Sequence, residues 1–102
     1  MAQTDLLKSD TVNALARIFK VLGDPTRVRI LDALSRSEEC VGALASQLRL
    51  TESAVSHQLR ILRDTRVVRS RREGRMIFYA LDDRHVLTLF RQGLRHAEED
   101  HR

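Results

Sequence analysis

Residues 40–62, with the sequence CVGALASQLRLTESAVSHQLRIL, contain two short amphipathic segments separated by a break at Arg49 and Leu50. Their apolar residues recur at helical spacing: Val41, Leu44, Ala45 and Leu48 in the first segment, and Val55, Leu59 and Leu62 in the second. Thr51 stands where a side-chain cap would begin the second helix. Two short helices joined by a tight turn form a helix-turn-helix, so this stretch predicts that motif.

The outer side of the second helix is polar. In a helix-turn-helix, this helix lies in the major groove of DNA with its N-terminal residues near the base edges. Glutamine suits adenine, arginine suits guanine, and serine or histidine can contact a base or a phosphate. The candidate DNA-contacting residues are Ser53, Ser56, His57, Gln58 and Arg60. Exposed polar helix faces are also common in proteins that bind no DNA, so the choice depends on the charge distribution.

The excess positive charge lies in one quarter of the chain. Residues 51–75 hold seven arginines and three acidic residues, whereas the rest of the chain has eleven basic and eleven acidic residues. Such a concentration predicts a surface for a polyanion. Aromatic residues make up only 4% of the chain, which argues against stacking on single-stranded bases and favours duplex DNA.

A basic hairpin is predicted directly after the helix-turn-helix. Residues 67–71 and 76–81 are rich in β-branched or aromatic residues, and they flank a turn at 72–75 that contains Gly74. The arginines at its tip would reach the phosphate backbone or the adjacent minor groove: Arg71, Arg72 and Arg75. The predicted fold class is therefore α+β, mostly α, a winged helix-turn-helix with a two-stranded wing.

Two more helices are predicted before this motif. Residues 11–22 are amphipathic, and Gly23 would end that helix. Asp24 as a cap and Pro25 at the first helical position would begin the next, whose apolar side consists of Val28, Ile30, Leu31 and Leu34. A chain of 102 residues has room for one domain, residues 1–102, with a modest core, so dimerisation would help to bury apolar surface.

The last predicted helix, residues 83–99, has two stripes. The first consists of His85, Leu89, Gln92, His96 and Glu99, at alternating steps of four and three. This spacing is typical of a seam between two helices. The second stripe is apolar and is expected to face the body of the domain: Val86, Phe90, Leu94 and Ala97. The chain is therefore predicted to form a homodimer through its N- and C-terminal helices.

The same helix carries four candidate metal ligands. Asp83 and His85 lie at one end, and His96 and Glu99 lie eleven residues further on, or about 16 Å along a helix. An antiparallel copy would bring opposite ends together and make two equivalent sites between subunits. Alternatively, Asp83 is a helix cap and the others are a solvated face. From the spacing alone, this second interpretation is slightly preferred.

The run ECVGALASQLRLTESAVSHQLRILRDTRVVRSRREGRMIFYAL, residues 39–81, resembles the helix-turn-helix and wing of the ArsR/SmtB family of metal-sensing repressors. The segment DPTR at 24–27 resembles the family's usual start of its second helix, and SAVSHQL at 53–59 is the most specific block. One branch of the family has zinc ligands on its C-terminal helix, in a pattern that Asp83, His85, His96 and Glu99 match throughout. The resemblance thus favours the metal-ligand interpretation.

The resemblance implies a transcriptional repressor that is not an enzyme. A metal-free dimer would bind an imperfect inverted repeat in operator DNA, and Zn²⁺ or Co²⁺ would release it and derepress genes for metal export or sequestration. Two imidazoles and two carboxylates suit these borderline ions. Four protein ligands close a tetrahedral site, which argues against a zinc hydrolase and a small-molecule substrate.

Two alternatives involve the same fold: a repressor that ignores zinc, and a thiol sensor that responds through Cys40. Relatives with a second, thiolate-rich site combine a cysteine at this position with N-terminal Cys or His ligands, and residues 1–39 contain neither. Cys40 is therefore interpreted as a small buried hydrophobe or a leftover ligand. A single cysteine, with no apolar run that could cross a membrane and no signal-peptide pattern, predicts a cytoplasmic protein.

Overall fold

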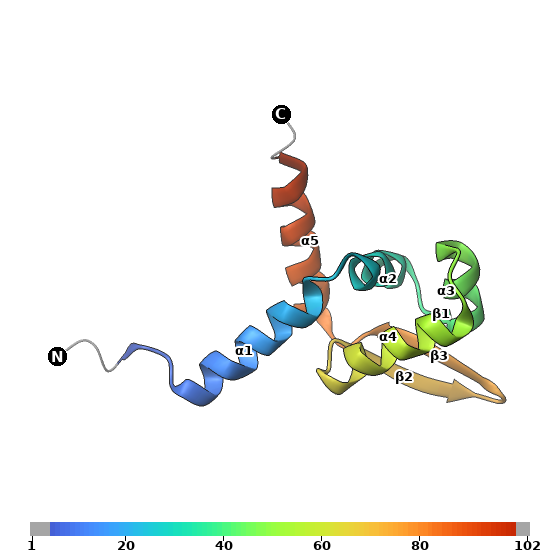
Figure 1. Cartoon of the computed structure of the whole chain (residues 1–102), viewed down its shortest axis with the longest axis horizontal. Helices are drawn as coiled ribbons and strands as arrows, with labels where there is room; N and C mark the ends of the chain where they lie inside the picture. Colours follow the sequence, from blue (N-terminus) through green and yellow to red (C-terminus); the bar gives the residue numbers. More distant parts are fainter. Residues whose placement is uncertain (1–4, 100–102) are drawn as a thin grey trace.

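The computed structural model describes residues 5–99, which form five helices and a small three-stranded sheet (Figure 1). In chain order the elements are α1 (Ser9–Leu22), α2 (Pro25–Arg36), β1 (Glu39–Cys40), α3 (Val41–Leu48), α4 (Glu52–Asp64), β2 (Val68–Glu73), β3 (Met76–Leu81) and α5 (Arg84–Glu99). The predicted winged helix-turn-helix is confirmed: α3 and α4 form the motif, and β2 and β3 form the wing. Within these residues no helix combines the length and apolar character needed to cross a membrane.

Local contacts explain where α2 and α4 begin and where α3 ends. The Asp24 side chain accepts a hydrogen bond from the Arg27 backbone N–H at 3.1 Å, and Pro25 occupies the first helical position of α2. The Thr51 hydroxyl accepts from the Ala54 N–H at 3.0 Å and begins α4. Arg49 takes the left-handed conformation, with φ 58°, that turns the chain from α3 into α4.

The sheet differs from the predicted two-stranded wing. Its strand order is β1-β3-β2, all antiparallel, with Glu39 opposite Tyr79 and Cys40 opposite Phe78. Cys40 therefore belongs to a strand and precedes α3, instead of opening that helix. Strand β3 has the predicted bounds, whereas β2 begins one residue later and ends two residues later than predicted. Glu73 pairs with Met76, so only Gly74 and Arg75 remain for the turn. Gly74 has φ 63°, which glycine adopts without strain.

The core lies between α2, α3, α4 and the strands, and it fixes the orientation of α4. Val55, Leu59 and Leu62, the apolar side of that helix, are at most 1% exposed. Ile30, Leu31, Leu34 and Leu44 are also buried, together with Val67, Val68 and Leu81. Val28, predicted to be buried in α2, is instead 43% exposed. The polar side of α4 consequently faces away from this core and towards solvent.

Both α1 and α5 extend away from this core, in different directions (Figure 1). None of the described α5 residues is buried. Val86 and Phe90 pack against the edge of the core, but Leu94 and Ala97, expected on the same buried stripe, are exposed. The prediction was wrong for that half of the helix, because the body of this small domain ends beside its first turns.

Thr51→Ala should lower the free energy of unfolding by about 1 kcal/mol, because it removes the oxygen that caps the N-terminus of α4. Urea denaturation at one fixed protein concentration measures the change. Thr51→Ser, which keeps the hydroxyl, is the matched control and should remain within about 0.5 kcal/mol of the unsubstituted protein. Equal losses in both variants would contradict the capping role.

Candidate metal centre and nucleic-acid interface

Asp83 and His85 form a pair at the N-terminal end of α5. The Asp83 Oδ1 atom accepts a hydrogen bond from the Val86 backbone N–H at 3.1 Å, so Asp83 does cap the helix. Its second oxygen, Oδ2, lies 3.3 Å from Nδ1 of His85. The His85 side chain is 94% exposed, which leaves the pair open to solvent. Capping and the proposed ligand role therefore use different oxygens of one carboxylate.

The separation of this pair is that of an Asp–His hydrogen bond, and it is also compatible with two ligands of a tetrahedral metal ion. Metal–nitrogen and metal–oxygen bonds of about 2.0–2.1 Å place neighbouring ligand atoms about 3.3 Å apart in a tetrahedral zinc site, the separation that Oδ2 and Nδ1 have here. The Val86 N–H, and next the neighbouring His85, hold the pKa of Asp83 below its usual value. Asp83 is therefore deprotonated under ordinary conditions, as a metal ligand must be.

The other two predicted ligands do not join this pair within one chain. His96 and Glu99 lie in the last turns of α5, and a rise of about 1.5 Å per residue places His96 about 16 Å from His85 along the axis. Among residues 5–99, no group of three or more potential ligands is close enough to hold one ion. A four-ligand site would thus require a second copy of α5.

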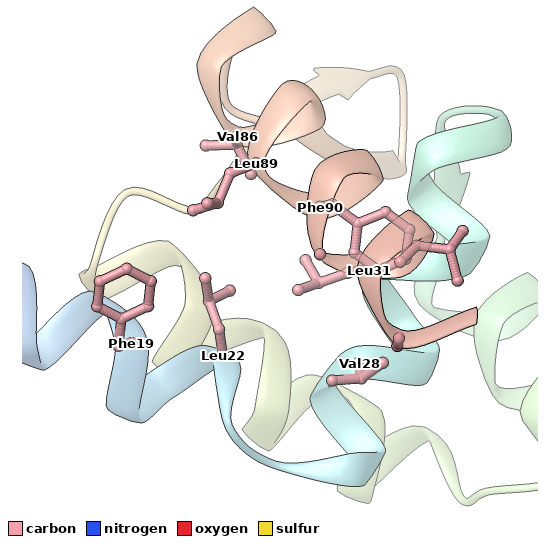
Figure 2. Close-up of a pocket in the computed structure, with 10 residues that line it drawn as sticks. Phe19, Leu22, Val28, Leu31, Val86, Leu89 and Phe90 are labelled. Atoms are coloured by element: carbon pink, nitrogen blue, oxygen red, sulfur yellow. The ribbon is translucent and has the colours of Figure 1, made fainter. Parts of the chain in front are cut away.

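An apolar groove of about 340 Å³ separates α5 from α1 and α2. Figure 2 shows Phe19 and Leu22 of α1 on one side and Val86, Leu89 and Phe90 of α5 on the other, with side chains of α2 between them. Phe19 is 54% exposed and Leu89 is 40% exposed. Exposed apolar patches of this kind mark interaction surfaces, so the groove, which we call the α1–α5 groove, is a candidate contact surface.

The predicted DNA-contacting residues of α4 fall into two groups. Ser53, Ser56, His57 and Arg60 are exposed on the side opposite the buried leucines, as expected. Gln58 is half-buried instead, and its Oε1 accepts a hydrogen bond from Arg27 Nε at 3.0 Å. In the sequence, Arg27 was noted only as part of the segment 24–27 at the start of α2. Its contact with Gln58 was therefore not predicted. The contact holds the Gln58 side chain against α2, away from the fully exposed residues of α4.

The three predicted wing arginines also differ in their surroundings. Arg72 and Arg75 are exposed near the turn. The Arg71 guanidinium lies 4.9 Å from the centre of the Phe78 ring and makes a two-pronged contact with Glu38, at 2.9 Å from Nε to Oε2 and 2.7 Å from Nη2 to Oε1. Arg71 therefore anchors the wing to the segment between α2 and β1.

The pKa values of Arg71 and Glu38 are shifted in the directions expected for an ion pair. The hydrogen bond from Arg71 lowers the pKa of Glu38, and the same bond raises the pKa of Arg71. Within the hairpin, Arg69 Nη1 of β2 donates to the carbonyl of Asp82, the residue after β3, at 2.8 Å. The Arg71–Glu38 pair links the wing to the segment before β1, while Arg72 and Arg75 face solvent.

Cys40 is a free cysteine in strand β1, and it is half-buried where full burial was expected. Its strand is two residues long and pairs with the middle of β3. The position connects the wing to the start of α3. Nothing in the described geometry brings the thiol close to Asp83 and His85, which lie at the start of α5.

Comparison with known proteins identifies close relatives among bacterial regulators. The family model for bacterial regulatory proteins of the arsR family matches residues 24–70. A transcriptional repressor SmtB homolog from Synechocystis is 45% identical over 97 residues, which cover 95% of this chain and 74% of the relative. A cadmium resistance transcriptional regulatory protein, a CadC homolog from Staphylococcus aureus, is 36% identical, with 96% of this chain and 81% of that protein covered.

The structural comparison agrees over almost the whole chain. The solution structure of a homodimeric winged helix-turn-helix DNA-binding domain from Mycobacterium bovis, a possible ArsR-family regulator, superposes with a TM-score of 0.89 and 30% identity. It covers 98% of this chain and 93% of that domain. These relatives are transcriptional regulators and not enzymes. On the identity and coverage of these matches, the chain belongs to the arsR family of bacterial regulatory proteins.

Proposed function

We propose that this protein is a metal-responsive transcriptional repressor whose metal-free homodimer binds operator DNA, and that Zn²⁺, or Co²⁺, lowers its DNA affinity. The observation that carries the metal part is the Asp83–His85 pair, whose Oδ2 and Nδ1 atoms lie 3.3 Å apart at one end of a projecting helix. The relatives support the wider role, since one is named a transcriptional repressor and another a cadmium resistance regulator.

A second copy of the chain fits the uncovered surfaces of α1 and α5. The α1–α5 groove is lined by apolar side chains, and the M. bovis domain of the same fold is a homodimer. If two α5 helices pack antiparallel about a two-fold axis, Asp83 and His85 of one subunit face the end of the partner helix that carries its second ligand pair. Each of two equivalent sites would then take two ligands from each subunit.

The donor set favours a borderline ion. Two imidazole nitrogens and two carboxylate oxygens suit Zn²⁺ or Co²⁺, whereas Cd²⁺ prefers thiolates. The only cysteine of the chain is Cys40, which lies on the strand beside the wing. When bound, the ion would supply a bridge between two helices and no reaction. Release of repression would then permit expression of genes for metal export or sequestration.

Binding of DNA and binding of metal would be coupled, because both depend on how the two subunits of the dimer are arranged. Two α4 helices must be separated by the distance between operator half-sites to enter successive major grooves. An ion that joins the two α5 helices favours one arrangement of the subunits, and the reading helices move with the bodies to which they are packed. Because coupling is reciprocal, DNA weakens metal binding by the same factor that metal weakens DNA binding.

Zinc should release the protein from DNA, and removal of one ligand should abolish the release. The probe is a labelled operator selected from randomised DNA by the zinc-free protein, and binding is followed by fluorescence anisotropy as zinc and then a chelator are added. We expect zinc to weaken binding about 5- to 150-fold, the range of typical coupling energies. The variants His96→Ala and Glu99→Gln should bind the operator in the absence of zinc and should remain bound when zinc is added.

Glu98→Gln is the matched control for Glu99→Gln, because it changes the neighbouring carboxylate outside the ligand pattern. It should behave as the unsubstituted protein does. Loss of operator binding by His96→Ala without zinc would contradict the role assigned to that residue. Operator binding that zinc leaves unchanged in the unsubstituted protein would favour a repressor regulated in another way, including through Cys40.

Zinc affinity should fall as the pH is lowered from about 7 to 5. An imidazole must be deprotonated to bind the ion, and histidines titrate in this range. The pKa of Asp83 is lowered, so its carboxylate is charged above its usual titration range and does not contribute to the loss. Isothermal titration with zinc at several pH values measures the effect. A constant affinity across this range would rule out histidine ligation.

The wing arginines should contribute unequally to DNA binding. Arg72→Ala and Arg75→Ala should weaken binding to operator and random DNA alike, and each should lower the slope of log affinity against log salt by about 1, as expected for a lost phosphate contact. Arg71→Ala should change the slope less, because Glu38 holds its guanidinium. Glu38→Gln is the converse test, since it removes the charge that holds Arg71 and should make the slope steeper. Equal slopes in all four variants would contradict this assignment.

A further inference from the structure

A second cavity lies on a different side of α5 from the α1–α5 groove. It has a volume of about 620 Å³ and lies between the end of α2, the base of the wing and the first half of α5. The α5 residues that line it are spaced three or four positions apart and so share one face of the helix: Arg84, Leu87, Thr88 and Arg91. This face is separate from the one that carries Val86 and Phe90. We call the cavity the α2–α5 pocket.

The lining of the α2–α5 pocket carries an excess of positive charge. Three arginines from β2 and α5 contribute to it: Arg69, Arg84 and Arg91. Asp83 is the one acidic residue among the described lining residues, and both of its oxygens already make contacts within the start of α5. In the described part of the chain, Arg84 and Arg91 form no ion pair. Guanidinium groups without a carboxylate partner, gathered at one cavity, favour a phosphate-bearing ligand.

Arg69 is held at the pocket by a hydrogen bond of its own. Its Nη1 atom donates to the Asp82 carbonyl at 2.8 Å. A guanidinium has five N–H donors, so most of them remain for a ligand. The carboxylate of Glu38, which also interacts with Arg69, is bound in a two-pronged contact by Arg71. Thr88 adds a hydroxyl that makes no hydrogen bond within residues 5–99.

The floor of the α2–α5 pocket is apolar. Leu34 and Leu81, which are 5% and 9% exposed, belong to the core, and Leu87 packs against them at its edge. A volume of about 620 Å³ lies within the range of about 300–1,000 Å³ that is usual for sites of small organic molecules. The pocket therefore offers a basic rim to an anionic group and an apolar floor to the organic group that carries it.

We propose that the α2–α5 pocket binds a small organic phosphate monoester, with its phosphate group among Arg69, Arg84 and Arg91 and its organic group against the leucines. A bound ligand would join α5 to the base of the wing. The pocket lies within one chain, so its occupation requires neither metal nor DNA. The phosphate could belong to a free molecule or to a DNA backbone. Because α5 projects away from α4 (Figure 1), the geometry favours a free molecule.

The probe for this site is phenyl phosphate, which joins a phosphate group to a small apolar ring. Nitrogen–proton correlation spectra of the full-length, zinc-free protein, including the arginine Nε signals, are recorded as the probe is added at constant ionic strength. The Nε signals of Arg69, Arg84 and Arg91 should shift saturably, with a dissociation constant of about 1 mM or lower, typical of so small a ligand. Phenol and inorganic phosphate, which each lack one half of the probe, should bind about 10-fold more weakly or less.

Two arginine variants test the rim of the pocket. Arg84→Met and Arg91→Met should each weaken phenyl phosphate binding about 10-fold, because each removes a charge-assisted hydrogen bond. Arg95→Met is the matched control, since Arg95 is an exposed arginine of the same helix that does not line the pocket. It should leave the affinity unchanged. Arg69 is kept, because its loss would also break the contact with Asp82. The same spectra verify that each variant retains the fold.

Absence of saturable shifts, or equal affinity in Arg84→Met, Arg91→Met and Arg95→Met, would overturn the proposal. Equal binding of phenyl phosphate and inorganic phosphate would also overturn it, because the leucine floor would then contribute nothing. Binding of duplex DNA separates the two sources of phosphate. Unchanged DNA affinity in Arg84→Met and Arg91→Met supports a free molecule, whereas a loss as large as that in Arg72→Ala would assign these arginines to the DNA backbone and overturn the proposal.

Discussion

The length of one rigid helix is the constraint on which the proposed mechanism depends. Asp83 and His85 lie at the start of α5, and the second pair of predicted ligands lies about 16 Å away along the same axis. A helix of sixteen residues does not fold back on itself, so one chain offers only half of a tetrahedral site at each end. Binding of one ion by all four predicted ligands therefore requires two chains. The ion would bind only when the two subunits are arranged so that their α5 helices bring opposite ends together.

The distribution of buried residues separates the helix that we propose reads DNA from the helix that we propose binds metal. The buried side of α4 is packed into the core with at most 1% exposure, whereas α5 has no buried residue among those described. Among the described residues, those of α5 that pack against the core of their own subunit are Val86, Leu87 and Phe90, all in the first half of the helix, and a metal ion on α5 would act on this partly anchored helix. The reading helix would move as part of a rigid body, which is the kind of change that alters half-site spacing without disturbing the helix-turn-helix.

The sequence predicted most of the fold because the elements that form it are long and periodic. The caps Asp24 and Thr51 were also recognisable, since each precedes an apolar helical pattern. Strand β1 was missed because two residues are too short to show a period, and they become a strand only by pairing with β3. The exposure of Leu94 was missed for a different reason: an apolar stripe indicates that a partner exists but does not show whether it is the same chain or another.

Residues of the candidate site were predictable by type, but their contacts were not. Gln58 and Arg71 both face other parts of the domain through partners 31 and 33 positions distant in the chain, namely Arg27 and Glu38. No local pattern encodes such a pairing. Both contacts use an arginine that the charge distribution alone would assign to DNA or leave without a role, so a local excess of charge does not specify which side chains face the polyanion.

The two oxygens of Asp83 explain how a metal site can be placed at a helix terminus without cost to the helix. Oδ1 caps the first turn through the Val86 N–H, while Oδ2 faces His85. An ion bound through Oδ2 would leave the capping bond intact, so the start of α5 keeps its structure whether the ion is present or absent. Loss of the ion would then change only how two helices are joined. A reversible sensor needs this property, because each cycle of binding and release must return the same folded subunit to the operator.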